Sequence, residues 1–567
     1  MLDDVQAHRC VPPIKIELYH PLLAGFSNFQ FLEDSFESFA PNRDGAVRRC
    51  FSLARMLETA TLVRELIDPA GMLLYQHEQL SRKRATVNGF IFRFSFWREF
   101  LVHEDEIKLL SNDDCLGYAI VQEIRLETGE ARWNVFEAVF RSVTKPNWVL
   151  PHVGVYDFNV GGCRFSIRGN LYCQQDGLST VCAHVALRTL ISRVSPLHDI
   201  SYEKIDQVAK EVHSIDLKLG LTIGQIEKVL EDAELEYEDF CYDKDLISEK
   251  GNAMFVSGDI PIERLIHAGV ESGFGSLFGF KVESKVNGEA NSCPSPLTAE
   301  AKKDSRHIIP IFGHSFNGLA WFNEAGRQYF REKNVTLLYS TGTCWTDGYL
   351  GHDDNVGPEV FIPQNYVQSK YHSYVLNLLK SKYHCAGIFV EDVARELMET
   401  YIGKQLPKTT HWSRRLRQMV LHTPTEIVYR ALSMTRRDYC KWLVQSRDWE
   451  GRFELETDCL LLEKELPELL WVVEVSCPHL YPGNLRKIGD IIFDARSITQ
   501  KERSCSDQPT PLFSIARFPM LYMIHPRIVA NTDDENDKGL AYGKRESRIF
   551  SHTSCIPVGV GKLIRNI

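Results

Sequence analysis

A cysteine at an abrupt change in sequence character is the first feature that suggests chemistry. The segment 174–181 is polar and contains Gly177, whereas apolar residues recur at helical spacing after Cys182. These apolar residues are Ala183, Ala186, Leu187, Leu190 and Ile191. The pattern predicts a largely buried helix that begins at or near Cys182, with Ser179 or Thr180 as its N-cap.

The start of a helix is a favourable place for a nucleophilic thiol. Its free N–H groups and partial positive charge favour the thiolate, which is the reactive form of cysteine. The same N–H groups can donate to the oxyanion that forms when a thiolate attacks a carbonyl group. Gln175 or Gln174, a few residues upstream, can supply a second donor. The alternative is that Cys182 is only a packed residue of a core helix, because buried cysteines are common.

A histidine that can act as the base opens a short apolar segment. Residues 306–314 read Arg-His-Ile-Ile-Pro-Ile-Phe-Gly-His, which predicts a strand with His307 at its entrance and Gly313 at its exit. A base at the mouth of a strand is held rigidly and stays accessible, as proton transfer requires. We expect His307, and not His314, to face Cys182. For His307 taken alone, the alternative is a strand-edge histidine without a role.

A turn rich in carboxylates follows a later apolar segment. Asp353 and Asp354 lie in the sequence Gly-His-Asp-Asp-Asn-Val-Gly-Pro at 351–358. One of these carboxylates can hold the His307 ring and stabilise its charged form. The sequence leaves open which of the two acts, and a solvated turn is the alternative.

Taken together, these segments resemble the papain-like cysteine peptidases, and most closely their C39-like branch. That branch has, in this order, a glutamine, a cysteine that opens a helix, a histidine that opens an apolar strand, an aspartate in a turn and often a glycine four positions on. Here these are matched by Gln175, Cys182, His307, Asp353 and Gly357. The resemblance covers roughly residues 165–365.

The resemblance implies a fold and an activity. The fold is α+β, with a papain-like domain made of a helical half and an antiparallel sheet. The activity is that of a peptidase that cleaves an amide of a protein or peptide substrate through a thioester, without a cofactor or a metal ion. The residues implied as catalytic are Cys182, His307, Asp353 or Asp354, and Gln175.

The chain is long enough for several domains. At 567 residues it exceeds what one hydrophobic core usually holds. We divide it into an N-terminal α+β domain at 1–155, the papain-like domain at 156–365 and a C-terminal α+β domain at 366–567. The sequence assigns no role to the two flanking domains.

Hydrophobic spacing predicts the elements of the flanking blocks. The expected helices lie within 46–68, 371–379, 390–401 and 412–444. The expected strands are 89–100, the hairpin pair 117–125 and 133–141, 470–475 and 489–493. Two polar segments, 287–303 and 533–544, are expected to be loops.

Composition and charge limit the class of protein. The net charge of −10, from 65 basic and 75 acidic residues, lacks the excess of basic residues that is typical of a nucleic-acid-binding protein. No run of 18 apolar residues predicts a membrane span, and the first residues do not read as a secretory signal. The 15 cysteines include no CxxC pair and suit reduced thiols. We therefore expect a cytoplasmic protein without a membrane or nucleic-acid partner, and the oligomeric state is not indicated.

Three other functions fit parts of the same pattern. Transglutaminase-like acyl transfer or deamidation uses the same order of Cys, His and Asp and passes through the same thioester. A non-enzymatic binding scaffold with a papain-like fold has no physical need for the full series of residues. A metal hydrolase would take histidines and carboxylates as ligands, although no HxH or HExxH motif is present. Its candidate ligands are His307, His314, His352, Asp353 and Asp354.

Overall fold

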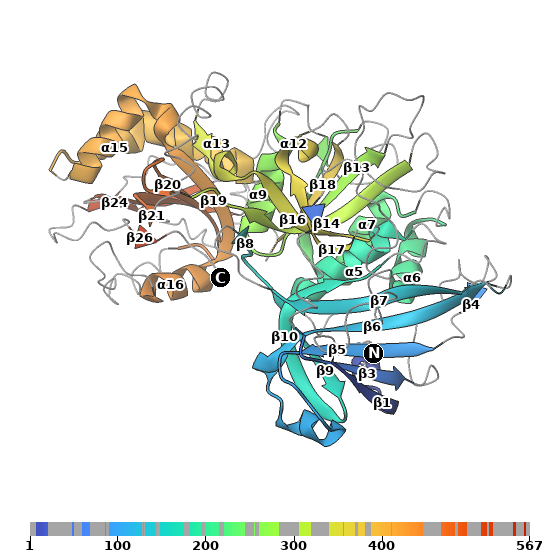
Figure 1. The fold of residues 1–567 in the computed structure, drawn as a ribbon. Helices are drawn as coiled ribbons and strands as arrows, with labels where there is room; N and C mark the ends of the chain where they lie inside the picture. Colours follow the sequence, from blue (N-terminus) through green and yellow to red (C-terminus); the bar gives the residue numbers. More distant parts are fainter. Residues whose placement is uncertain are drawn as a thin grey trace, which may run out of the picture.

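Three main sheets and the helices between them make up the described part of the chain in the computed structural model, which is a mixed α+β protein (Figure 1). The described residues are 7–20, 48–49, 59–67, 85–86, 90–126, 129, 131–142, 148–174, 181–194, 199–214, 220–243, 254–255, 260–282, 305–318, 339–354, 357–368, 372–379, 387–409, 411–445, 466–481, 486–495, 512–518, 521–524, 548–550 and 561–562. Among these residues, no helix has both the length and the apolar character needed to cross a membrane.

The first sheet is built from N-terminal strands, and all its pairs are antiparallel. Its strands are β1 (Pro13–Tyr19), β3 (Thr61–Ile67), β4 (Ala85–Thr86), β5 (Ile91–Trp97), β6 (Cys115–Leu126), β7 (Ala131–Arg141), β9 (Gly154–Val160) and β10 (Cys163–Tyr172). Their order is β1-β3-β5-β6-β7-β10-β9, with β4 paired to β6. The predicted strand at 89–100 is confirmed as β5, and the predicted hairpin is confirmed as β6 with β7.

The helix predicted within 46–68 is wrong over residues 61–67, which form β3. Leu62 faces one hydrophobic core of the first sheet, whereas Val63 and Ile67 face the other. Because both faces of the strand are covered, apolar residues occur without strict alternation, and their spacing resembles a helical pattern.

The central sheet carries the predicted histidine and aspartates. Its strands are β2 (Arg48–Arg49), β8 (Trp148–Val149), β11 (Glu236–Cys241), β12 (Met254–Phe255), β13 (Ser276–Val282), β14 (Ser305–Ser315), β16 (Gly348–Asp353), β17 (Gly357–Pro363) and β18 (His372–Leu379). The order is β12-β11-β18-β13-β14-β16-β17-β2, with β8 on β14, and every pair except β11 with β12 is antiparallel. The strand predicted from His307 to Gly313 is confirmed as part of β14, which begins two residues earlier and ends two residues later.

Helices cover both faces of the central sheet. On one face lie α5 (Cys182–Val194), α6 (Tyr202–Val212) and α7 (Ile223–Asp232), and on the other lies α9 (Ile262–Glu271). Leu277 shares a core with α5 and the first sheet, whereas its neighbour Phe278 shares a core with α9. Because adjacent strand residues point to opposite faces, the layers are stacked in the order first sheet, α5, central sheet and α9. The predicted helix after Cys182 is confirmed as α5.

The third sheet packs against α9, on the side that faces away from the central sheet. Its strands are β15 (Ser340–Thr341), β19 (Val428–Thr435), β20 (Leu469–Ser476), β22 (Gly489–Asp494), β23 (Leu512–Phe518), β24 (Leu521–Ile524) and β25 (Arg548–Phe550), paired in this order. A separate two-stranded sheet pairs β21 (Arg486–Lys487) with β26 (Gly561–Lys562). Helices α13 (Gly387–Leu397), α15 (His411–His422) and α16 (Arg436–Gln445) lie around the third sheet. The strands predicted at 470–475 and 489–493 are confirmed.

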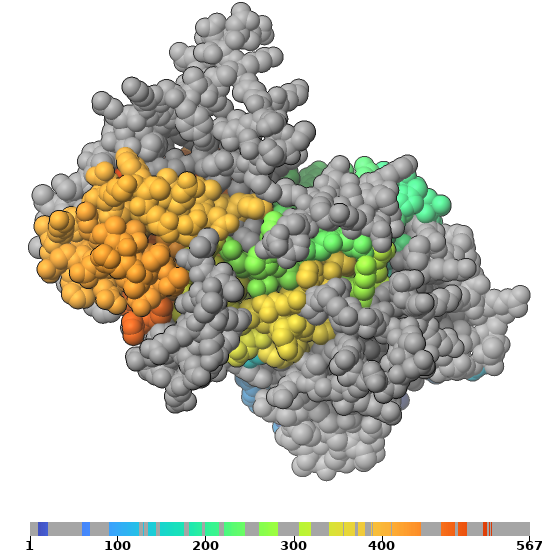
Figure 2. Space-filling model, turned by 90° about the horizontal axis from the view of Figure 1, so that it is seen from above, coloured from blue at the N-terminus to red at the C-terminus, as the bar shows by residue number. Residues whose placement is uncertain are grey.

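The third sheet and its helices pack directly on the central sheet's α9 side. Figure 2 shows the orange residues of the C-terminal helices beside the green and yellow residues of the central part. The Arg264 guanidinium of α9 lies 2.7 Å from the Glu391 carboxylate of α13. The Ser433 N–H of β19 donates to Ser272 Oγ, just after α9, at 3.0 Å.

One further predicted helix is wrong, and another is wrong in part, for the same reason as the helix predicted over β3. In the segment 371–379, residues 372–379 form β18, which lies between β11 and β13 and is buried on both faces. The helix predicted within 412–444 is confirmed at 412–422 and 436–444, which belong to α15 and α16, but residues 428–435 form β19, which is also buried on both faces. In each case the apolar run carries no alternation that would distinguish a strand from a helix. The helix predicted at 390–401 is confirmed as α13 and the helical turn that follows it.

Sheet pairing does not follow the predicted block boundaries. β9 and β10 lie within the predicted papain-like block but belong to the first sheet. β18 lies beyond residue 365 but is an interior strand of the central sheet, and β2 and β8 join that sheet from the N-terminal block. Neighbours in these sheets come from distant parts of the chain, which local spacing does not report. The predicted loops at 287–303 and 533–544 lie outside the described residues.

Candidate active site

Cys182 is the first residue of α5. The Val185 N–H donates to the Val181 carbonyl at 3.0 Å, which forms the first turn of the helix. Every residue from Ala183 to Arg193 is buried, whereas Cys182 itself is half-buried. The thiol therefore lies at the accessible end of a helix that is otherwise enclosed by the first and central sheets. The predicted caps Ser179 and Thr180 lie outside the described residues.

The structure brings Cys182 and His307 together. The Cys182 side chain lies close enough to the His307 ring to raise its pKa, although the two residues are 125 positions apart in the printed sequence. His307 lies in β14, against which α5 packs, and its ring is 3% exposed. The ring of Phe280 on the neighbouring strand β13 stands edge-on to the His307 ring, with ring centres 5.4 Å apart. The histidine is thus held by packing on one side and faces the thiol on another.

Both predicted aspartates reach the same nitrogen of His307. The distances from His307 Nε2 to Asp353 Oδ1 and to Asp354 Oδ1 are each 3.3 Å. The contact with Asp353 has the geometry of a hydrogen bond, and the contact with Asp354 is an ion pair. Both carboxylates therefore contact His307, and Asp353 has the geometry of its hydrogen-bond acceptor.

A hairpin fixes the position of the aspartates. Asp353 ends β16, the neighbour of β14, and pairs with Gly357 at the start of β17. Gly357 has φ of 136°, a backbone conformation that side-chain-bearing residues rarely adopt. The glycine four positions after the aspartate is therefore required by the turn.

The electrostatics of the site favour a charged histidine. Burial alone lowers the pKa of His307, but the Asp353 and Asp354 carboxylates outweigh this effect and hold the pKa well above its ordinary value. The carboxylates therefore favour the protonated ring, which presents a cation to Cys182. A neighbouring cation stabilises a thiolate, which is the nucleophilic form.

Of the two glutamines considered as oxyanion donors, only Gln174 is among the described residues. Gln174 is buried, and its Oε1 accepts a hydrogen bond from the Val135 N–H at 2.9 Å. Its own N–H donates to the Val135 carbonyl at 2.9 Å, so that the residue continues the pairing of β10 with β7. Gln175, which the resemblance names as the oxyanion donor, lies outside the described residues.

The five ligands expected for a metal hydrolase do not form one site. His307, Asp353 and Asp354 lie together, with ligand atoms within 4.8 Å of one another. His314 lies instead against α9, where its Nε2 is 2.9 Å from Glu271 Oε1. His352 is enclosed by Tyr172 and Phe312, and burial, together with Arg193, lowers its pKa to about 3.

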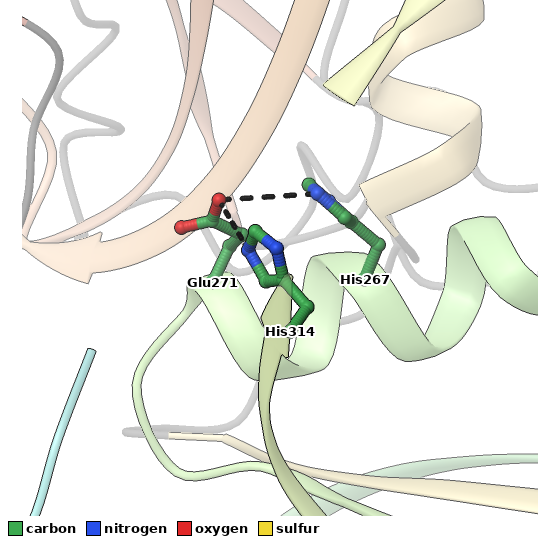
Figure 3. Close-up of side chains that lie close together, drawn as sticks. All are labelled: His267, Glu271 and His314. Carbon is green, nitrogen blue, oxygen red and sulfur yellow. Dashed lines mark hydrogen bonds and ion pairs between the residues drawn. The ribbon is translucent and has the colours of Figure 1, made fainter. Parts of the chain in front are cut away.

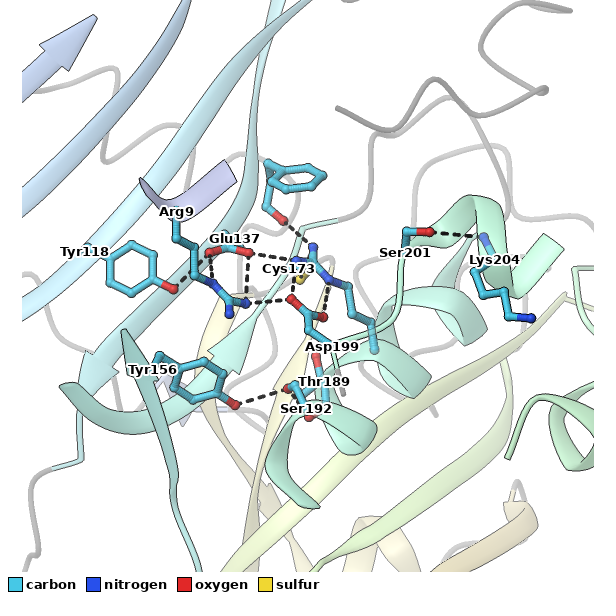
Figure 4. A network of polar contacts seen from close by, with 12 residues as sticks. Arg9, Tyr118, Glu137, Tyr156, Cys173, Thr189, Ser192, Asp199, Ser201 and Lys204 are labelled. Atoms are coloured by element: carbon cyan, nitrogen blue, oxygen red, sulfur yellow. Dashed lines mark hydrogen bonds and ion pairs between the residues drawn. The ribbon is translucent and has the colours of Figure 1, made fainter. Parts of the chain in front are cut away.

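A buried ionic network that holds α5 was not predicted (Figure 4). Glu137 of β7 accepts from Arg9 Nε at 2.8 Å, from Arg188 Nη2 of α5 at 2.7 Å and from the Tyr118 hydroxyl at 2.9 Å. Asp199 lies 2.6 Å from Arg9 Nη2 and 3.0 Å from Arg188 Nε. These five residues are almost fully buried. They bind the cysteine helix to the first sheet, and their separation along the chain leaves no local signal.

A second unpredicted pair includes His184, two residues after Cys182 in α5. His184 Nε2 is 2.9 Å from Asp206 Oδ1 of α6, and both side chains are buried. The pair ties the first turn of α5 to the neighbouring helix. The sequence signal for it is an ordinary histidine within an apolar helix, which does not identify its partner.

Three comparisons, with protein-family models, with curated proteins and with solved structures, find no match to the chain.

Proposed function

We propose that the chain is a cysteine hydrolase that cleaves an amide bond of a protein or peptide substrate through a thioester. The observation that supports this most directly is the meeting of Cys182, at the start of α5, with a His307 ring whose Nε2 is held by Asp353 and Asp354. The nucleophile, the base and the group that orients the base come from three separate elements. Such an arrangement is the minimum needed for an activated nucleophile.

Each residue has a defined part in the proposed reaction. The Cys182 thiolate attacks the carbonyl carbon, and the first N–H groups of α5 donate to the resulting oxyanion. His307, held through Nε2 by Asp353, gives its other ring proton to the leaving amine, and the thioester remains. His307 then takes a proton from water as the water attacks the thioester, which releases the acid and restores the thiolate beside the charged His307 ring.

We also propose that the central part of the chain has a papain-like fold. The support is the packing of a cysteine-bearing helix on an antiparallel sheet whose neighbouring strands β14 and β16 carry the histidine and the aspartate. Within this proposal, α9 covers the opposite face of the sheet and connects it to the third sheet. The flanking sheets are additions to the papain-like part.

The activity can be tested by the appearance of new peptide termini. A proteome-derived peptide mixture incubated with the full chain should yield new amino termini, and Cys182→Ser should yield none. Cys163→Ser, which changes a half-buried cysteine of β10, is the matched control and should behave as wild type. A peptidase activity that survives Cys182→Ser would contradict the proposal.

Acyl transfer is the alternative that shares this geometry, because it differs only in what attacks the thioester. Ammonia release from glutamine-containing peptides, or incorporation of an added primary amine, should be absent or slower than peptide cleavage if the chain is a hydrolase. Amine incorporation without new termini would instead identify a transglutaminase-like enzyme. A scaffold without activity would show neither reaction.

The aspartates should control the pH at which Cys182 reacts. Asp353→Asn together with Asp354→Asn removes the carboxylates that raise the pKa of His307 and leaves the burial that lowers it. The imidazolium should then be lost at lower pH, and alkylation of Cys182 by iodoacetamide at about pH 6 should slow by more than about tenfold. The measurement is the alkylation rate of Cys182 as a function of pH.

The control for this experiment is Asp347→Asn, which changes an exposed carboxylate just before β16. It should leave the pH profile of alkylation unchanged. If the double variant keeps the wild-type profile, His307 does not control the reactivity of Cys182.

A further inference from the structure

A second cluster of possible ligands lies on the opposite side of the central sheet from α5. It consists of His267 and Glu271, one turn apart on α9, and His314 of β14 (Figure 3). The exposed fractions of these residues are 4%, 5% and 0%. Glu271 Oε1 lies 2.9 Å from His314 Nε2 and 3.9 Å from His267 Nε2. Two imidazoles and one carboxylate oxygen thus point toward the same small volume.

The contacts of His314 require a cation in this volume. Its Nδ1 is 2.8 Å from the Ser315 carbonyl oxygen, which can only accept a hydrogen bond, so Nδ1 carries a proton. Its Nε2 faces the Glu271 carboxylate, which also only accepts. Two lone pairs at this distance repel each other unless a positive charge lies between them. That charge is either a second proton on the ring or a metal ion.

The surroundings resemble the outer partners that orient metal ligands. A hydrogen bond from Nδ1 to a backbone carbonyl fixes the ring of His314 with Nε2 directed at the cluster, as is usual for a coordinating histidine. The other oxygen of Glu271 is held by Arg430 of β19. Glu271 is therefore positioned to offer a single oxygen to an ion.

Gly342 closes the volume beside His267. A Cβ atom at this position would lie 3.0 Å from His267 Nε2 and 2.8 Å from the Tyr481 hydroxyl. A larger residue would therefore collide with the histidine ring. The small residue leaves room beside His267 Nε2 next to a hydroxyl group.

We propose that His267 Nε2, His314 Nε2 and Glu271 Oε1 bind a divalent first-row metal ion, with zinc as the best match to two imidazoles and a carboxylate. Ligands on a tetrahedral zinc ion at about 2.05 Å lie about 3.3 Å apart. The two measured separations from Glu271 Oε1 bracket this value, so modest side-chain rotations would complete the site. The fourth position would be taken by water or by a nearby hydroxyl.

The proposed ion would have a structural role. Its ligands are buried, and they join α9 to β14 at the place where Arg430 connects Glu271 to Glu474 of β20. The ion would therefore fasten the central sheet to the third sheet. This site is separate from the cluster of His307, Asp353 and Asp354, and its existence does not depend on the proposed hydrolase activity.

Zinc binding by the full-length chain tests the proposal. After removal of metals with a chelator, titration with zinc should show about one tightly bound ion per chain and a rise in the midpoint of thermal unfolding. Cobalt at the same site should give the visible bands of four-coordinate Co²⁺ without a thiolate charge-transfer band. If no stoichiometric zinc binds, or if cobalt shows a six-coordinate or thiolate spectrum, the proposal is overturned.

Two substitutions locate the ion. His267→Gln should weaken zinc binding by at least about 100-fold, because even loss of an outer partner costs about 10–100-fold. His307→Gln should leave zinc binding unchanged, as should the matched control His352→Gln, which changes a buried histidine of the same sheet. Loss of zinc in His307→Gln but not in His267→Gln would overturn the assignment. If His267→Gln does not fold, the cobalt spectrum of the unchanged chain decides the question.

Discussion

Replacing His307 with alanine should lower peptide turnover by several powers of ten, with little change in substrate binding. The reason is that nucleophile and base act as a unit, so that removal of either one removes most of the chemical step. Alkylation of Cys182 at neutral pH should slow as well, because the cation beside the thiol is lost. The measurements are kcat and KM on a cleaved peptide and the alkylation rate on the same preparation.

His372→Ala is the matched control for this substitution. His372 is a half-buried histidine at the start of β18 in the same sheet, and its ring stands against Tyr242 rather than Cys182. Its replacement should leave turnover within a few-fold of wild type. His314 serves less well, because it is buried against Glu271 and its loss would also affect stability. Equal losses in His307→Ala and His372→Ala would contradict a specific role for His307.

Glu137→Ala should destabilise the junction of the first sheet and α5 by about 3–5 kcal/mol, because it leaves buried charges without their partner. Arg9 and Arg188 both lose a carboxylate in a region where neither can reach water. Asp199 remains as the only described carboxylate that contacts either guanidinium. Urea unfolding measures the loss of stability. Hydrogen exchange of peptides from α5 and β7 shows whether this loss lies at the junction of the first sheet and α5.

Asp157→Ala is the control for the buried network. Asp157 pairs with Arg164 at 2.7 Å across the neighbouring strands β9 and β10, and both side chains are exposed. Exposed ion pairs contribute little, so this variant should unfold as wild type does. A Glu137→Ala variant that is no less stable than Asp157→Ala would show that the network does not hold α5.

Local sequence patterns predicted those elements whose signals are local. The helix after Cys182 was predictable because a polar segment changes to an apolar helical pattern at one residue. The hairpin of β6 and β7 was predictable because two strand-like runs flank a turn. β3, β18 and β19 were not, because strands buried on both faces carry apolar runs without alternation. The pairing of β18 inside the central sheet depends on contacts that no local pattern encodes.

The candidate site was predictable to the extent that its residues have distinctive neighbours. Cys182, His307, Asp353 and Asp354 each lie at or near the end of an element, and the structure brings them together. Ionic partners such as Arg9 and Glu137 are 128 residues apart and share no motif. The cluster on α9 had a weak signal in the spacing of His267 and Glu271, but its third member comes from a strand on the other side of a long segment. The contacts of these polar residues are important because the residues are buried, and this burial is not visible in the sequence.

The accessible cysteines and the buried cysteines of the chain are two groups against which the reactivity of Cys182 can be compared. Nine of the 15 cysteines are in the described residues, and among these Cys10 is exposed while Cys163 and Cys440 are half-buried like Cys182. Burial raises the pKa of Cys115 to about 12 and that of Cys173 to about 11, so both should react slowly. Accessibility alone would therefore place Cys10 first.

The most direct test of Cys182 as an activated nucleophile is the alkylation rate of every cysteine in the folded full-length chain. Limiting iodoacetamide is added over a range of pH, and the labelled peptides are quantified by mass spectrometry. We predict that Cys182 reacts at least about tenfold faster than Cys10 near neutral pH, because the charged His307 ring lies beside its thiol. Faster labelling of Cys10 than of Cys182 would contradict the proposed function.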